Sequence, residues 1–122
     1  MKSFEDLLVY QKARDFRKSI SDMAKDLPSE EKFRLKDQIL RSSRSITAQI
    51  AEGHGRFHHQ ENIQFCRIAR GSLDETHEHL NLALDEGFIT AERHSTLLEM
   101  KFEVGRVLNG YINFLIKSKA PK

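Results

Sequence analysis

Between Leu35 and Gly55, apolar and small side chains recur at intervals of three and four residues, which is the period of a helix buried along one side. The repeating positions are Leu35, Ile39, Ser42, Ile46, Ile50 and Gly53. The sequence therefore predicts a helix with this stripe in the core. We expect Gly53 or Gly55 to close the helix in the left-handed conformation.

The opposite side of this predicted helix combines small side chains with long cationic ones. It holds Arg34, Arg41, Arg44, Ser45, Ala48 and Glu52. Small side chains allow a second backbone to come close, and arginine suits phosphate because its planar fork donates two hydrogen bonds at once. The face is thus either an ordinary charged surface or a contact surface, for another subunit or for a phosphate backbone.

Three further segments repeat the helical period. They cover residues 4–27 after the N-cap Ser3, residues 60–85 before the stop Gly87, and residues 91–115 after the N-cap Thr90. No segment shows the two-residue alternation of a strand. Short connections force neighbouring helices to run antiparallel, so we predict an all-α fold, an antiparallel up-and-down four-helix bundle. Residues 1–122 are expected to form a single domain, with a frayed basic tail over residues 117–122.

Small residues also interrupt the third predicted helix, from Ala69 to Ser72. A glycine within a helix costs about 1 kcal/mol relative to alanine, so close approach of another helix at Gly71 is expected to compensate. This small-residue segment and the predicted helix over residues 35–55 together supply the candidate interface or close-packing residues: Ser45, Ala48, Glu52, Gly53, Gly71 and Ser72. Apolar residues beyond the needs of one core indicate oligomerisation; these are Val9, Tyr10, Phe102 and Phe114.

The charge is unevenly distributed along the chain, although the net charge is only +2. Residues 34–70 hold seven bases and three acids, whereas residues 71–103 hold eight acids and two bases. This asymmetry fits an anionic partner or self-association. The candidate nucleic-acid contacts are Arg34, Arg41, Arg44, Arg56, Arg67 and Arg70. Against this interpretation, the pI of 8.8 is only mildly basic and no aromatic residues are interleaved with the arginines.

No constellation of catalytic residues stands out. Helical bundles can hold metals through paired Glu-x-x-His motifs, and the best candidate group is Asp74, Glu75, His77 and His79. A second such motif is missing, and no serine lies in a Gly-x-Ser-x-Gly elbow. We therefore expect no enzyme activity, metal, cofactor or small-molecule substrate, and keep a small metal-binding bundle as a remote alternative.

The chain has no apolar run approaching the roughly 20 residues that span a bilayer, and its first residues do not read as a secretory signal. We therefore expect no membrane association and a cytoplasmic location.

Several motifs together resemble the four-helix-bundle family encoded by intervening sequences of bacterial 23S ribosomal RNA genes. They are Phe4-Glu5-Asp6-Leu7, Tyr10-Gln11-Lys12-Ala13, Leu35-x-x-Gln38-Ile39-x-Arg41-Ser42-x-x-Ser45-Ile46, Ile50-Ala51-Glu52-Gly53 with Arg56, and Ala69-x-Gly71-Ser72-Leu73-x-Glu75. The chain departs from the family pattern at Gln49, Thr47 and Tyr10, where asparagine, proline and tryptophan are common.

This resemblance implies an antiparallel bundle that assembles into a ring-like homopentamer. The accessory proteins of diversity-generating retroelements, which are more distantly similar, work with a reverse transcriptase and nucleic acid. By analogy we expect RNA or a ribonucleoprotein as partner, with Arg41 and Arg56 as the first contacts. The alternative is a protein–protein adaptor with no nucleic-acid role, docking through the acidic third helix.

Overall fold

Four helices and two short 3₁₀ turns make up the computed structural model, which describes residues 2–118. In chain order the elements are η1 (Phe4–Asp6), α1 (Leu8–Ala24), η2 (Ser29–Glu31), α2 (Leu35–His54), α3 (His59–Asp85) and α4 (Ala91–Ser118). No strand occurs among the described residues. The all-α prediction is confirmed, and so is the position of each of the four predicted helices.

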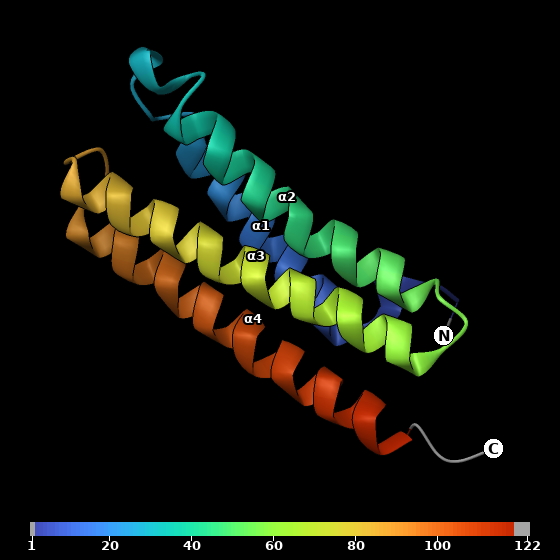
Figure 1. Cartoon of the computed structure of the whole chain (residues 1–122). Helices are drawn as coiled ribbons and strands as arrows, with labels where there is room; N and C mark the ends of the chain where they lie inside the picture. The colour runs from blue at the N-terminus through green and yellow to red at the C-terminus, as the bar shows by residue number, and fades with distance from the viewer. Residues whose placement is uncertain (1, 119–122) are drawn as a thin grey trace.

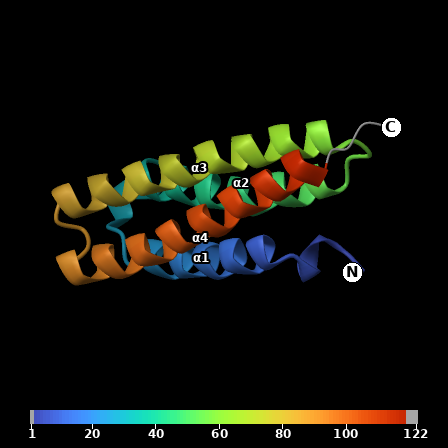
Figure 2. The ribbon, with the colours of Figure 1, turned by 90° about the horizontal axis from the view of Figure 1, so that it is seen from below.

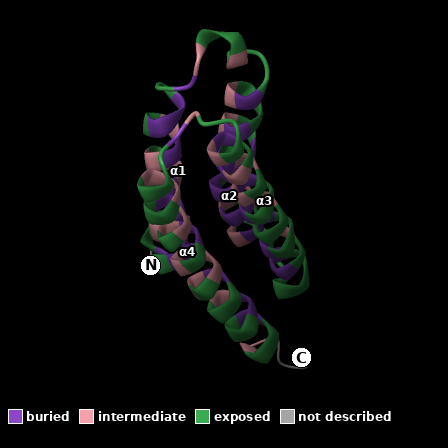
Figure 3. Cartoon of the chain, turned by 90° about the vertical axis from the view of Figure 1, so that its left-hand side faces the viewer, coloured by how far each residue is buried: buried purple, intermediate pink, exposed green. Residues whose placement is uncertain are grey.

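The helices form an antiparallel up-and-down bundle (Figures 1 and 2). Helix α1 packs against α2 and α4, and α3 packs against the same two helices. Between the diagonal pairs α1/α3 and α2/α4, no two Cα atoms of residues 2–118 lie within 8 Å of each other. Figure 3 shows the result as two layers, α1 with α4 and α2 with α3, whose buried positions face one another.

The core consists of the predicted stripes. Fully buried side chains include Phe16 and Ile20 of α1, Ile46 of α2, Leu80 of α3 and Leu108 of α4. Burial of side chains of this size stabilises the fold by about 1.5–3 kcal/mol each. One predicted surplus residue, Val9, belongs to this core with an exposed fraction of 2%, so the prediction was wrong there. In contrast, Phe102 and Phe114 are 57% and 61% exposed on α4.

Helices α2 and α3 pack against each other through small and hydroxyl-bearing residues. The hydroxyls of Ser42 and Thr76 lie 2.8 Å apart, and Ser72 Oγ donates to Ser45 Oγ at 2.9 Å. Near the end of α2, a Cβ added to Gly53 would lie 2.6 Å from Asn62 Oδ1, so only glycine fits. Gly55 is the C-cap of α2 with φ −77°, and Gly53 lies within the helix, so the prediction that one of them closes the helix in the left-handed conformation was wrong.

The other helix ends follow their sequence signals, except at Ser3. Ser3 caps the short turn η1 rather than α1, because Leu7 is extended and separates the two. Gly87 closes α3 with φ 77°, the backbone N–H of Phe88 donates to Ala83 O, and Thr90 caps α4. The predicted frayed tail is helical through Ser118, and residues 119–122 lie outside the described residues.

In the part of the chain that the structure describes, every helix is too short or too polar to cross a membrane.

Candidate nucleic-acid interface

The outer side of α2 presents a row of exposed residues separated by three, four, seven or eight positions, which are whole numbers of helical turns to a good approximation. It begins at Arg34, continues through Arg41, Arg44 and Ala48, and ends with Arg56 just beyond the helix. The row faces solvent because the opposite stripe, which includes Ile39, Ile46 and Ile50, is fully buried. Four of the six predicted arginines therefore lie along one side of one helix.

Three of these arginines are paired with carboxylates close in sequence. Arg34 Nη1 lies 3.9 Å from Glu31 Oε2, and Arg41 Nη2 lies 3.1 Å from Asp37 Oδ2. Arg56 Nη2 lies 2.8 Å from Glu52 Oε2, and its guanidinium also lies 4.7 Å from the ring centre of Phe65. Exposed pairs of this kind contribute only about 0–1 kcal/mol each, so a phosphate can displace the carboxylate at little cost.

Arg44 differs from its neighbours, since no carboxylate of the described residues lies within 4 Å of its side chain. The same is true of Arg17 on α1, whose Nη1 donates a hydrogen bond of 3.0 Å to Thr47 Oγ1. The Thr47 hydroxyl donates in turn to the backbone carbonyl of Arg44. This chain of hydrogen bonds fixes the Arg17 guanidinium beside α2 and leaves its other N–H donors free.

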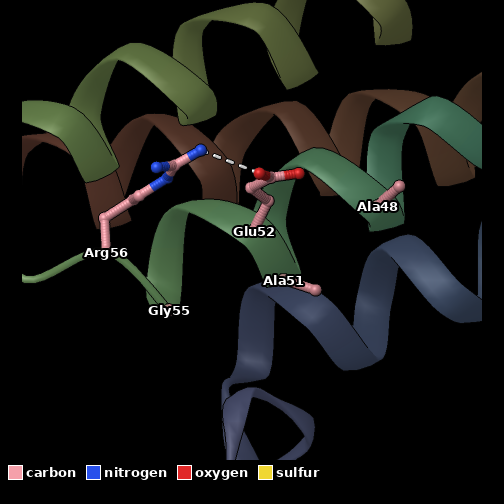
Figure 4. Close-up of a pocket in the computed structure, with 5 residues that line it drawn as sticks. All are labelled: Ala48, Ala51, Glu52, Gly55 and Arg56. Atoms are coloured by element: carbon pink, nitrogen blue, oxygen red, sulfur yellow. Dashed lines mark hydrogen bonds and ion pairs between the residues drawn. The ribbon is translucent and has the colours of Figure 1, made fainter.

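Two adjoining hollows follow this side of α2. The first, of about 530 Å³, is lined by Ala48, Ala51, Glu52, Gly55 and Arg56. Figure 4 shows its small floor residues, with the Arg56–Glu52 pair along one wall. The second, of about 400 Å³, shares Ala48 and Ala51 with the first and is lined further by Phe4, Tyr10, Arg17, Arg44 and Thr47. We call the second hollow the aromatic hollow.

The aromatic wall of this hollow is held in place by η1. Ser3 Oγ accepts from the backbone N–H of Glu5, and the Asp6 carboxylate accepts from the backbone N–H groups of Lys2 and Ser3. These backbone hydrogen bonds lower the pKa of Asp6, which stays ionised and keeps the cap formed. Phe4 then meets Tyr10 edge to face, with 4.9 Å between the ring centres.

The remaining two predicted arginines lie elsewhere. Arg67 is exposed on α3, and no carboxylate of residues 2–118 lies within salt-bridge distance of it. Arg70 Nη1 donates to Asn109 Oδ1 of α4 at 3.0 Å. Because α4 is diagonal to α2, Arg70 is turned away from the arginine row. The structure therefore does not unite all six arginines on one surface.

The six candidate interface or close-packing residues divide into two groups. Ser45, Gly53 and Ser72 mediate the contact of α2 with α3 inside the chain. Ser45 had been expected on the outward face, and its hydrogen bond to Ser72 places it at the helix contact instead. Ala48, Glu52 and Gly71 are exposed. A Cβ on Gly71 would meet nothing within 4 Å, so the expected close approach of another helix is wrong within the described chain.

The candidate metal group is split between different contacts. Asp74 Oδ1 lies 2.9 Å from Lys101 Nζ, while His79 Nε2 lies 3.2 Å from Glu75 Oε2. His77 meets the ring of Phe102 edge to face, and burial together with the charge of Lys101 lowers its pKa. Over residues 2–118, no three His, Cys, Asp or Glu side chains are grouped as ligands of a metal ion.

Arg17, Phe4 and Tyr10 were not predicted as site residues. Residues 1–33 hold seven bases and seven acids, so the charge of this stretch gives no sign that Arg17 contributes to a basic surface. A signal was present, because Tyr10 and Arg17 are seven residues apart and thus share one side of α1. Nothing in the sequence, however, indicates that this side meets Arg44.

Comparisons with known proteins agree with the architecture. A family described as 23S rRNA-intervening sequence protein matches residues 5–110. A crystal structure of a protein with unknown function from the S23 ribosomal protein family of Bacteroides thetaiotaomicron is similar, with a TM-score of 0.80 and 30% sequence identity. The match covers 86% of this chain and 98% of that one. No curated protein matches.

The family match extends over most of the chain and includes all of α1, α2 and α3. The similar crystal structure is matched over almost its whole length, so the shared fold is that of the complete bundle. The chain belongs to the family of 23S rRNA-intervening sequence proteins.

Proposed function

We propose that this protein is a non-enzymatic, cytoplasmic homopentamer that binds RNA, or a ribonucleoprotein, as an accessory or scaffold module. The observation that carries the proposal is the row of exposed arginines on the outer side of α2. From Arg34 to Arg56 this row spans about 30 Å at the rise of an α-helix, long enough to follow several phosphates. Its ion pairs are local and exposed, so they do not prevent phosphate binding.

The comparisons support the choice of partner. The family name refers to 23S rRNA, and the similar crystal structure is assigned to a ribosomal protein family. The pentamer rests on the resemblance described above, and the exposed Phe102 and Phe114 of α4 leave apolar surface for contacts between subunits.

The test is fluorescence anisotropy of the purified oligomer with a structured ribosomal RNA fragment, and with a DNA duplex of matched sequence, across a salt series. We expect the logarithm of the association constant to fall linearly with the logarithm of the salt concentration, with a slope that reports the number of phosphates contacted. The double substitution Arg41→Glu/Arg56→Glu should weaken RNA binding at least tenfold and make the slope shallower by roughly 0.7–0.9 for each lost contact.

The matched control is Arg106→Glu/Lys117→Glu on α4, which changes the net charge equally and lies on the helix diagonal to α2. If both double variants lose the same affinity, binding follows net charge and the α2 row is not the site. If the wild-type protein binds no RNA even at low salt, the proposal is wrong. In that case the function to test next is that of a protein–protein adaptor, which would bind its partner through the acidic stretch of residues 71–103.

The oligomeric part of the proposal has its own measurement. Native mass spectrometry should give a species of about 71 kDa, five times the 14.2 kDa chain. Another mass would refute the pentamer without bearing on RNA binding.

A further inference from the structure

We propose that the aromatic hollow beside α2 is a binding site for single-stranded RNA, in which one base stacks on Tyr10, beside Phe4, and the adjoining phosphates contact Arg17 and Arg44. The inference rests on the proposed function and makes it specific, since it names the form of RNA and adds three residues from the N-terminal part of the chain. The arginine row alone would not distinguish a single strand from a duplex.

The first argument is the combination of shape and chemistry. The hollow has a volume of about 400 Å³, within the range of about 300–1,000 Å³ typical of small-ligand sites. Its floor, Ala48 and Ala51, carries only methyl groups, so a flat ring can reach the surface of α2. Apolar floor, aromatic wall and cationic rim together match a nucleotide, which has an apolar ring face and a charged phosphate.

The second argument is the electrostatic state of the two arginines. Arg34, Arg41 and Arg56 each lie near a carboxylate, whereas Arg17 and Arg44 have none within 4 Å among the described residues. Glu52, an acid of the adjoining hollow, is engaged by Arg56 at 2.8 Å. Among residues 2–118, the positive charge at the aromatic hollow therefore has no carboxylate paired with it, unlike that of Arg34, Arg41 and Arg56.

The third argument is that the hollow is organised before any ligand arrives. Thr47 fixes the Arg17 guanidinium, and the capped turn η1 holds Phe4 against Tyr10. Phe4 and Tyr10 are both only partly buried, so part of each ring is open to a base. Little conformational entropy would then be lost on binding.

A single strand fits this arrangement better than a duplex. Bases inside a duplex are already stacked on both faces, and only an unpaired base can turn one face to an aromatic ring. The adjoining hollow extends along α2 toward Arg56 and offers a path for the backbone of the same strand.

The first test uses the protein's own fluorescence. The chain contains two tyrosines and no tryptophan, so a Tyr111→Phe variant leaves Tyr10 as the only strong emitter. Tyr111 belongs to α4 and is not a lining residue of the aromatic hollow; its hydroxyl accepts from Asn62 Nδ2. Addition of a short oligoadenylate should shorten the Tyr10 fluorescence lifetime at least twofold, and the same RNA annealed to its complement should leave the lifetime unchanged. A lifetime measurement is insensitive to light absorbed by the RNA.

The second test separates stacking from charge. Tyr10→Leu should weaken oligoadenylate binding at least fivefold without changing the salt slope, and Tyr10→Phe should retain the affinity. Arg44→Gln should make the slope shallower by about 0.7, the value for one phosphate of a single strand. Arg106→Gln on α4 is the matched control and should change neither quantity. Circular dichroism and native mass are recorded for each variant.

The outcomes separate this inference from the proposed function. RNA that binds the wild-type protein without changing the Tyr10 lifetime, or that binds equally well as single strand and duplex, overturns the aromatic hollow and leaves the arginine row standing. A changed oligomer mass in Tyr10→Leu or Arg44→Gln would identify the hollow as a subunit contact and also overturn the inference. If the protein binds no RNA of any form, both proposals are wrong.

Discussion

Replacing Gly53 by alanine tests the close contact between α2 and α3. The added Cβ would lie 2.6 Å from Asn62 Oδ1, 2.9 Å from Phe65 Cβ and 3.2 Å from Asn62 O. The Asn62 side chain could rotate away, but the other two atoms move only if α3 itself shifts. Rotation of Asn62 would also break its hydrogen bond to Tyr111, whose oxygen lies 3.1 Å from Asn62 Nδ2.

The expected cost follows from three contributions. Overpacking of a close helix contact destabilises by about 2–3 kcal/mol, at the upper end of the usual range because backbone must move. Loss of the Asn62–Tyr111 hydrogen bond adds about 1 kcal/mol. Alanine recovers up to about 1 kcal/mol of helix propensity. We therefore expect Gly53→Ala to lower the free energy of unfolding by about 2–3 kcal/mol, a decrease in Tm of roughly 10 °C for a chain of this length.

The control is Gly110→Ala, in the middle of α4, where a Cβ meets nothing within 4 Å. This variant should gain about 0.5–1 kcal/mol. Urea denaturation followed by circular dichroism gives both values, at one protein concentration because self-association adds to apparent stability. If Gly53→Ala is as stable as the wild type, or gains stability as Gly110→Ala does, the close contact is not rigid and our account of the α2–α3 packing is wrong.

Two further predictions concern buried titratable groups. Burial raises the pKa of the Cys66 thiol from 9.0 to about 11. Between these two pH values the unfolded chain has lost the thiol proton while the folded protein still holds it. The free energy of unfolding therefore falls as the pH rises from about 9 to about 11. Between pH 8 and pH 10 we expect a loss of about 1 kcal/mol that Cys66→Ala does not show in urea titrations; an equal loss in both proteins would contradict this origin. The second prediction concerns the ion pair between Lys101, which is 8% exposed, and Asp74, which is largely exposed. Asp74→Asn should cost about 1 kcal/mol or more because the buried ammonium loses its carboxylate, whereas Lys101→Met should be nearly neutral in the same thermal-melting assay, and the reverse order would refute the argument.

Helical period predicted the fold well because each helix here is amphipathic and buries one stripe. The stripe of α2 was assigned correctly from Leu35 to Gly53, and all its apolar members are buried. The local signals for helix ends also sufficed where a single residue decides them, as at Gly87 and Thr90. Two of the errors lie at Gly53 and Gly71. A glycine within a helix can mark close approach of a neighbouring helix or have no packing role, and the neighbour that decides is distant in sequence.

The candidate site was less predictable, because it combines residues from segments far apart in the chain. The Tyr10 side of α1 and the Arg44 side of α2 meet only after the bundle is assembled. The objection that no aromatic residues are interleaved with the arginines was correct along the sequence and does not hold in space, where Phe4 and Tyr10 line the same hollow as Arg44.

One part of the electrostatics could nevertheless be derived from the sequence, namely which arginines are neutralised locally. In every ion pair within one helix or turn of the described structure, the acid precedes the base by three or four residues; Asp37 with Arg41 and Glu52 with Arg56 are examples. This order is the favourable one for helical pairs. Arg70 has an acid only on its C-terminal side, at Asp74, and that pair is not formed.

Arg44 has no acid at any of these positions, and neither has Arg17. Their lack of local counter-ions was thus readable before the fold was known, although their convergence on one hollow was not. Arg93 marks the limit of the argument, because it too has no local acid but reaches Asp22 and Asp26 on α1. The sequence can therefore identify the few arginines that have no acid three or four residues away. Only the packing of the helices decides which of these arginines remain available to a phosphate.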